Sequence, residues 1–382
     1  MSSMLPTARP AARNLADVLP DCLELLTTAH GPAGVDHIIV VLVDGLGAQN
    51  LSSRRGHART LTALRSTTIA SVFPSTTAAA LTSLATGTLP GRHGIVGYAA
   101  RDLASGRVVN QISGWDELVD SDGWQRETTV FQRAVAADVA PVAIGPASFA
   151  RSGFTRHVLS GAEYRAADSL SDRVDAAVAA TRRAPRTLSY LYVPELDKAG
   201  HRFGSESPEW TAALEQLDQA FRRLLGSLPK RTGVLVTADH GMVDVPAHRQ
   251  LLFGDDPALM TPVVAVGGEP RMLHLYGDGD MTGDDREALA AVWRDAEGER
   301  SWVLSREDAI MMGLFGDVDE EVVPRIGDVL VAARARVAYY DGRLGAGDPA
   351  RRMVGQHGSM TDEETRIPLL AAGAFADGGV FD

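Results

Sequence analysis

The chain contains little cysteine, and it has no long hydrophobic run. Its single cysteine, Cys22, excludes an internal disulfide, and its apolar surroundings predict a buried, unreactive thiol. No stretch approaches the roughly 18 apolar residues that a membrane-spanning helix needs. Residues 1–21 also lack the continuous apolar segment of a secretory signal peptide. We therefore expect a cytoplasmic protein that does not insert into a membrane.

Positive charge is scarce as well. The 382 residues include 49 acidic and 37 basic side chains, only two of them lysines (Lys198 and Lys230), and the net charge is −12. This balance argues against a protein that binds nucleic-acid polymers or anionic membranes, since both require a basic surface. A small anionic ligand remains possible, because bound cations can invert the local field. No pattern in the sequence indicates an oligomeric state.

Continuous apolar runs predict the strands of a buried parallel sheet. They are HIIVVLVDGLG (37–47), VAPVAIG (139–145), TLSYLYVPELD (187–197) and TGVLVTADHG (232–241). A helical pattern separates the last two, with Ser207 as the expected N-cap and Pro208 at the first helical position. Alternating strands and helices predict an α/β fold with a mostly parallel sheet flanked by helices. The run IPLLAAG (367–373) predicts a strand that returns to this sheet.

Residues 246–350 differ in sequence pattern from the rest of the chain. RMLHLYG, DDREALAAVWRDA and IGDVLVAARARVAYY indicate a smaller α+β subdomain inserted into the main one. We therefore expect a catalytic core made of residues 1–245 and 351–382, interrupted by this insertion.

Acidic and histidine side chains occur where the predicted strands end. Ligands of open α/β sheets bind beyond the carboxyl ends of the strands. Any one of these acids could serve only as a turn residue or a helix cap. Together, three carboxylates and three imidazoles suit two Zn²⁺ or Mn²⁺ ions that share a site. The six residues are Asp44, Asp197, His201, Asp239, His240 and His357.

Three adjacent hydroxyls, Ser75, Thr76 and Thr77, precede a small-residue helix in FPSTTAAALTSLATG. Helix capping explains one hydroxyl but not three. A two-metal centre can lower the pKa of a bound alcohol and so create a nucleophile, and a helix N-terminus favours an incoming phosphate. The residues alone leave open which hydroxyl attacks.

Over residues 37–375 the motifs DG, a threonine nine residues before TG, HGI, DxxxH, DHG and HG occur in this order. They resemble the alkaline phosphatase superfamily, and within it the type I phosphodiesterase/nucleotide pyrophosphatase group. The resemblance implies that Asp197, His201 and His357 hold one metal. It implies that Asp44, Asp239, His240 and the nucleophile hold the other. Counting back from Thr86 and Gly87 makes Thr77 the nucleophile, with Thr76 as the alternative.

Within this group the chain looks most similar to the soluble actinobacterial cyclic di-AMP phosphodiesterases. That narrower resemblance implies hydrolysis of cyclic di-AMP, by way of the linear dinucleotide pApA, to AMP through a phosphothreonine intermediate. Two departures concern substrate binding. Ala78 stands where nucleotide pyrophosphatases carry a base-stacking Phe, and Tyr98 stands where they carry a phosphate-binding Asn. The aromatic candidates for stacking on the base are Phe73, Tyr98, Trp115, Tyr164 and Phe203.

Single residues argue for or against other functions within the superfamily. Sulfatases need a Cys or Ser in a C/S-x-P-x-R context, which Cys22 does not have. Phosphonoacetate hydrolases use lysines soon after the nucleophile, and no lysine occurs between Thr77 and Lys198. A general nucleotide pyrophosphatase, acting on nucleoside triphosphates or dinucleoside polyphosphates, remains an alternative. So does a catalytically inactive nucleotide sensor.

Overall fold

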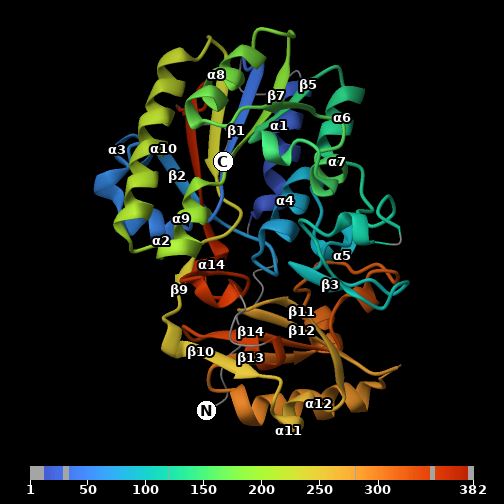
Figure 1. Ribbon diagram of the computed structural model, residues 1–382. Coiled ribbons are helices and arrows are strands. Elements are labelled where there is room, and N and C mark those ends of the chain that lie inside the picture. The colour runs from blue at the N-terminus through green and yellow to red at the C-terminus, as the bar shows by residue number, and fades with distance from the viewer. Residues whose placement is uncertain (1–12, 29–33, 119, 280, 345–348, 377–382) are drawn as a thin grey trace.

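A seven-stranded sheet forms the centre of the computed structural model, in the order β2-β17-β8-β1-β7-β5-β6 (Figure 1). The structure describes residues 13–28, 34–118, 120–279, 281–344 and 349–376. The strands are β1 (His37–Val43), β2 (Arg65–Ala70), β5 (Ala140–Gly145), β6 (Glu163–Ala166), β7 (Thr187–Val193), β8 (Thr232–Thr237) and β17 (Arg366–Gly373).

The sheet is mostly parallel, and the predicted fold class is confirmed. β1 pairs in parallel with β7 and β8, and β5 pairs in parallel with β6 and β7. The returning strand β17 runs antiparallel between β8 and β2. The sequence did not predict β2 and β6, because these edge strands, RSTTIA and EYRA, are too exposed to need a continuous apolar run.

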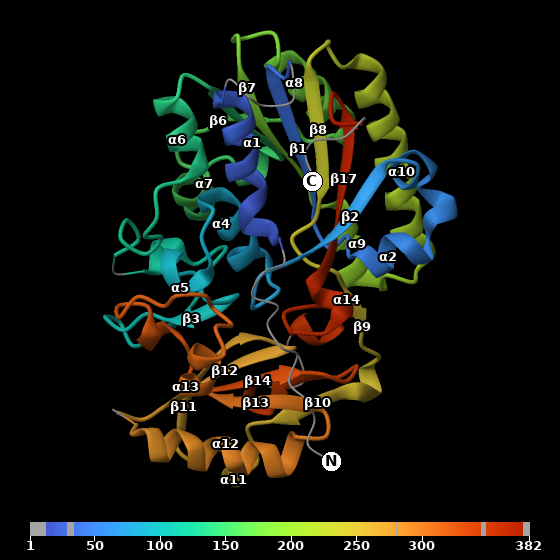
Figure 2. The same cartoon turned by 180° about the vertical axis from the view of Figure 1, so that it is seen from behind.

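Helices cover both faces of this sheet, as the two opposite views show (Figures 1 and 2). On one face α1, α4 and α6 contact one another, and on the other α8 packs against α10. The bounds are α1 (Val18–Thr27), α4 (Thr77–Thr86), α6 (Val130–Ala136), α7 (Gly153–Val158), α8 (Leu170–Ala180) and α10 (Pro208–Ser227). Further helices are α2 (Ala48–Ser53), α3 (Arg59–Thr62), α5 (Pro90–His93), α9 (Glu195–Phe203) and α14 (Asp362–Thr365).

A second, four-stranded antiparallel sheet lies below the first in the order β11-β12-β14-β13 (Figure 2). Its strands are β11 (Val263–Glu269), β12 (Met272–Gly277), β13 (Ser301–Ser305) and β14 (Val329–Ala333). The helices with it are α11 (Pro257–Met260), α12 (Gly283–Glu297) and α13 (Arg306–Met311). Three two-stranded pairs complete the fold: β3 (Ala99–Arg101) with β4 (Val108–Asn110), β9 (Val243–Asp244) with β16 (Gly355–Gln356), and β10 (Gln250–Phe253) with β15 (Ala338–Asp341).

The larger hydrophobic core spans the seven-stranded sheet and its helices and continues into the four-stranded sheet through Met272 and Leu330. A smaller core contains Trp293 of α12 together with Leu273 and Val331 of β12 and β14. We propose, from the separate four-stranded sheet and this smaller core, that residues 246–350 form the inserted subdomain and that residues 1–245 and 351–382 form the catalytic core. Parts of that core, residues 1–12 and 377–382, lie outside the described residues. None of the helices in the described part of the chain combines the length and the apolar character that crossing a lipid bilayer demands.

Candidate two-metal active site

The register of the central sheet brings the three predicted acids together. Val43 of β1 lies beside Val193 of β7, and Leu42 lies beside Thr237 of β8. The segments that follow these three parallel strands therefore start at the same edge of the sheet. Asp44 follows β1 directly, Asp239 follows β8 by two residues, and Asp197 lies in the first turn of α9, just after β7.

His357 reaches this edge from a distant part of the sequence. The short strand β16 pairs with β9, which follows the DHG motif, and His357 comes directly after β16. An antiparallel bridge between Ser75 and Gly358 then fixes the next residue against the hydroxyl run. The loop carrying His357 is thus held between the end of β8 and the start of α4.

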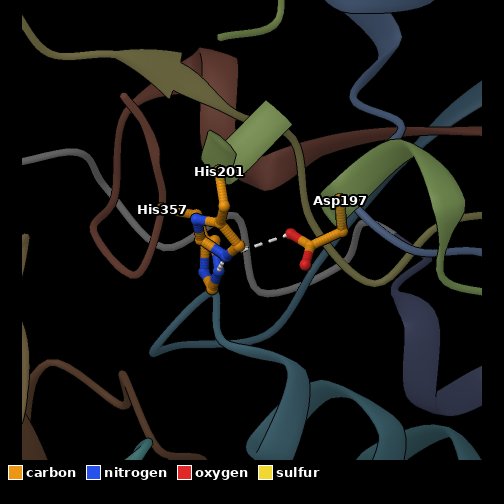
Figure 3. Close-up of side chains that lie close together, drawn as sticks. All are labelled: Asp197, His201 and His357. Atoms are coloured by element: carbon orange, nitrogen blue, oxygen red, sulfur yellow. Dashed lines mark hydrogen bonds and ion pairs between the residues drawn. The ribbon is translucent and has the colours of Figure 1, made fainter. Parts of the chain in front are cut away.

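One group of candidate ligands consists of Asp197, His201 and His357 (Figure 3). The first two lie four residues apart on α9, on the same helix face, with Asp197 Oδ1 3.2 Å from His201 Nε2. His357 Nε2 lies 3.3 Å from His201 Nε2. Potential ligand atoms from all three residues lie within 4.8 Å of one another, as a single metal ion requires.

The second group consists of Asp44, Asp239 and His240. His240 Nε2 lies 3.4 Å from Asp44 Oδ1 and 3.4 Å from Asp239 Oδ2. The His240 ring stacks on the His357 ring with centroids 3.6 Å apart, so the two groups are adjacent. The structure therefore brings all six predicted ligands into one cluster, divided into the two sets that the resemblance implies.

Hydrogen bonds to backbone carbonyls orient all three imidazoles. The Nδ1 atoms of His201, His240 and His357 lie 2.8, 3.1 and 3.1 Å from the carbonyl oxygens of Gly355, Gly241 and Ser75. A carbonyl only accepts, so each Nδ1 carries the proton and each Nε2 keeps its lone pair. The three Nε2 atoms point into the cluster, which is the tautomer and orientation that metal ligation needs.

The three hydroxyls of the Ser-Thr-Thr run take different places. Ser75 Oγ donates to the Ser359 carbonyl at 2.6 Å, which ties the run to the His357 loop. Thr76 is the N-cap of α4, yet its side chain makes no capping hydrogen bond. Thr77, the first residue of α4, places Oγ1 3.1 Å from His240 Nε2. Capping therefore does not explain the run, and Thr77 is the hydroxyl that faces the candidate ligands.

Burial is the largest cause of the raised pKa of every acid in the cluster. Desolvation raises the pKa of Asp197 to about 7 and that of Asp239 to about 7. It also raises the pKa of Asp44, helped by the nearby Asp239 carboxylate. Burial lowers the pKa of His240 to about 4, so that this imidazole stays neutral and able to bind a metal at pH 7.

The buried carboxylates also have unused oxygen atoms. Asp44 Oδ1, Asp197 Oδ1 and Asp239 Oδ2 have no hydrogen-bond partner among the described residues. Unpaired buried oxygens are costly, whereas a bound divalent cation would satisfy them and offset the negative charge. Their oxygen and imidazole donors fit Zn²⁺ or Mn²⁺, so the residues present suit a two-metal centre.

Added Mn²⁺ or Zn²⁺ is expected to raise the melting temperature of the metal-free protein more at pH 8 than at pH 5. The pKa of Asp197 and that of Asp239, both about 7, are higher in the fold than in the unfolded chain, so the metal-free protein loses stability as the pH rises to about 7. At pH 8 a metal neutralises ionised carboxylates, whereas at pH 5 it must displace protons. Thermal unfolding with metal or chelator at both pH values tests this. An equal or larger shift at pH 5 would contradict it.

Sequence analysis missed several residues around the cluster. The Tyr192 hydroxyl donates to Asp44 Oδ2, and Tyr192 in turn packs against Phe149 with ring centroids 6.0 Å apart. Lys198 was known only as the first lysine after Thr77, but its ammonium lies close enough to Asp44 and Asp197 to lower their pKa values. Its position inside DKAGH, next to Asp197, was the available signal. Burial raises the pKa of Glu269, a carboxyl beside the Thr76 hydroxyl that no motif pointed to.

The predicted base-stacking residues divide by exposure. Trp115 is buried, and Phe73 packs against Phe315 in the core, so neither offers a face to a nucleotide. Tyr98 and Phe203 are 38% and 42% exposed and remain candidates. The Tyr164 hydroxyl donates to the Pro146 carbonyl at 2.9 Å.

The chain belongs to the type I phosphodiesterase/nucleotide pyrophosphatase family, whose model matches residues 38–360. A human relative, ectonucleotide pyrophosphatase/phosphodiesterase family member 7, is 30% identical over 100 residues. That match covers 25% of this chain and only 20% of the human protein.

Solved structures share the fold. Murine ectonucleotide pyrophosphatase/phosphodiesterase 5 superposes with a TM-score of 0.69 at 20% identity, covering 88% of each chain. Phosphonoacetate hydrolase from Sinorhizobium meliloti 1021, in complex with phosphonoacetate, gives a TM-score of 0.65 at 19% identity. That alignment covers 90% of this chain and 92% of the hydrolase. The likeness confirms the alkaline-phosphatase-like α/β architecture.

Proposed function

We propose that the protein is a metal-dependent phosphodiesterase in which Thr77 is the nucleophile. One observation carries the proposal: Thr77 Oγ1 lies 3.1 Å from His240 Nε2, beside two groups of carboxylates and imidazoles that each suit one divalent ion. The family to which the chain belongs supports hydrolysis of phosphodiester or pyrophosphate bonds. An inactive threonine-to-alanine variant of the murine relative has been solved in complex with AMP, which supports a threonine nucleophile and a nucleotide substrate.

Each metal would be held by side chains already in place. Asp197, His201 and His357 would hold one ion, and Asp44, Asp239, His240 and Thr77 the other. Two such ions supply Lewis acidity that makes the threonine alcohol a nucleophile at neutral pH. Asp239 Oδ1 accepts from the Gly45 and His240 backbone N–H groups at 3.1 and 3.0 Å, which holds its other oxygen toward the cluster. The first turn of α4 directs N–H groups toward an incoming phosphate.

The reaction proceeds in two displacements at phosphorus. Thr77 Oγ1 loses its proton and forms a bond to phosphorus, and the bond from phosphorus to the 3′ ester oxygen breaks. The leaving 3′ oxygen takes up a proton. Water then attacks the phosphorus of the nucleotide-bearing phosphothreonine and loses one proton. The bond from Thr77 Oγ1 to phosphorus breaks, Thr77 Oγ1 takes up a proton, and the product leaves with a 5′-phosphate.

The preferred substrate we propose is cyclic di-AMP, opened to pApA and cut again to AMP. Both steps are attack of the same hydroxyl on a 3′–5′ phosphodiester, so one site can perform them. The negative net charge and the motif resemblance support a small nucleotide as partner and not a nucleic-acid polymer or a membrane. We propose that the protein acts in the cytoplasm. We propose that Tyr98 contributes a hydrogen bond to the phosphate.

Purified protein loaded with Mn²⁺ is expected to convert cyclic di-AMP to AMP, with pApA appearing and then disappearing. The reason is that the first cut leaves a second diester of the same kind. Liquid chromatography of timed samples measures all three compounds. Protein treated with a chelator is the control and should leave cyclic di-AMP intact.

Other outcomes assign the other functions. Rapid cleavage of ATP or diadenosine polyphosphates, with no turnover of cyclic di-AMP or pApA, would identify a general nucleotide pyrophosphatase. Tight binding of cyclic di-AMP without turnover of any of these compounds would identify a nucleotide sensor.

A further inference from the structure

The turn between β11 and β12 brings a carboxylate from the 246–350 region to the His357 loop. Glu269 ends β11, and its side chain is only 7% exposed. Glu269 Oε2 lies 3.4 Å from His357 Nδ1. Gly358 permits this approach: its φ is +120°, and a Cβ there would lie 2.6 Å from Glu269 Cδ. The two loops therefore meet at a contact that tolerates no side chain at residue 358.

A buried ion pair fixes the same turn. Arg271, two residues after Glu269, donates through Nε and one terminal nitrogen to the two carboxylate oxygens of Glu364 at 2.7 and 2.8 Å. Glu364 Oε1 also accepts from the Ser359 backbone N–H at 3.0 Å. Both side chains of the pair are fully buried. The Arg271–Glu364 pair thus joins the turn that carries Glu269 to Ser359, the residue after Gly358, and so holds Glu269 beside His357.

The side of His357 that faces Glu269 is the side away from the metal group. His357 Nε2 points toward His201 Nε2, which leaves Nδ1 as the protonated nitrogen. Among the residues that the structure describes, only the neutral Ser75 carbonyl, at 3.1 Å, competes for that proton. Glu269 Oε1 and Thr76 Oγ1 are both buried, and neither makes a hydrogen bond of ordinary geometry among the described residues. The Thr76 hydroxyl nevertheless faces the Glu269 carboxyl. Glu269 is therefore held in place with unused acceptor capacity.

We propose that Glu269 is a positioning residue, whose carboxylate orients His357 from the 246–350 region and strengthens its Nε2 as a metal ligand. A carboxylate that accepts the second N–H of a ligating histidine fixes the ring and raises its basicity. The second sheet thereby contributes directly to the centre built by the first. This inference rests on the metal site proposed above.

Calorimetric titration of metal-free protein with Zn²⁺ tests the role of Glu269 without relying on activity. Wild-type protein should bind two equivalents. Glu269→Gln, which keeps the shape and removes the charge, should bind one of them about 10- to 100-fold more weakly, the usual cost of losing such a partner. Glu269→Asp keeps the charge but moves it away from His357, so its zinc affinity should lie between those of wild type and Glu269→Gln. Glu297→Gln changes another carboxylate of the same region, paired with Arg300, and should bind as wild type.

A double-mutant cycle separates orientation of His357 from general destabilisation. If Glu269 acts through His357, adding Glu269→Gln to His357→Ala should weaken zinc binding no further. Additive losses, or wild-type affinity for both equivalents in Glu269→Gln, would overturn the inference while leaving the metal site in place. Wild-type protein that binds no second equivalent would overturn the two-metal proposal and this inference with it. If Glu269→Gln does not fold, the same cycle with Glu269→Asp decides.

Discussion

Thr77→Ala is expected to abolish turnover while metal and nucleotide binding persist. The substitution removes the hydroxyl that lies 3.1 Å from His240 Nε2, and it leaves the six candidate carboxylate and imidazole ligands intact. Loss of a covalent nucleophile lowers kcat by orders of magnitude, because no other group takes over the displacement. Steady-state kinetics on cyclic di-AMP, together with calorimetric binding of metal and AMP, measure the two effects separately.

Thr76→Ala is the matched control for this prediction. Thr76 is adjacent in sequence and buried, but its hydroxyl is turned toward Glu269 and away from the candidate ligands. It should retain most of the turnover that Thr77→Ala loses. An inactive Thr76→Ala beside an active Thr77→Ala would make Thr76 the nucleophile. In wild-type protein, acid quenching during turnover should trap a nucleotidyl group, linked through its phosphorus, on a peptide containing Thr77.

Asp239→Asn is expected to lose bound metal and activity together. Its Oδ1 can still accept from the Gly45 and His240 N–H groups, so the local backbone should hold. The neutral amide, however, replaces the unpartnered Oδ2 that lies 3.4 Å from His240 Nε2. Metal content, measured by elemental analysis, should fall below two equivalents per chain, and turnover should fall by orders of magnitude.

Asp218→Asn provides a comparison outside the cluster. Asp218 is also a buried carboxylate, and it accepts from the Leu61 N–H at 2.9 Å and the Thr60 hydroxyl at 2.8 Å. It belongs to neither group of candidate metal ligands. This variant should keep full metal content even if its melting temperature drops. Full metal content and activity in Asp239→Asn would remove the basis for the second metal position.

Much of the fold could be predicted because burial leaves a strong pattern. A parallel strand covered on both faces must be apolar throughout, so HIIVVLV identified β1 and similar runs identified β5, β7 and β8. The exposed edge strands β2 and β6 carry no such constraint, and their sequences gave no signal. The approach of Glu269 to His357 left no signal in the sequence either, because it depends on a contact between residues 88 positions apart (357 minus 269).

The sequence by itself predicted the chemistry of the candidate site, and the family match supports hydrolysis of phosphodiester bonds. Acids and histidines that follow apolar runs fall at one edge of a parallel sheet, because the carboxyl ends of such strands share that edge. The resemblance of the motifs to a known family also implied how the six candidate ligands divide. Only the tertiary structure decided which hydroxyl faces the cluster and which carbonyl orients each imidazole. Those choices depend on how loops from separate parts of the chain pack together, and local sequence does not encode that packing. The contact of the second sheet with the site likewise depends on tertiary packing. It is fixed by a buried Arg271–Glu364 pair whose partners lie far apart in sequence.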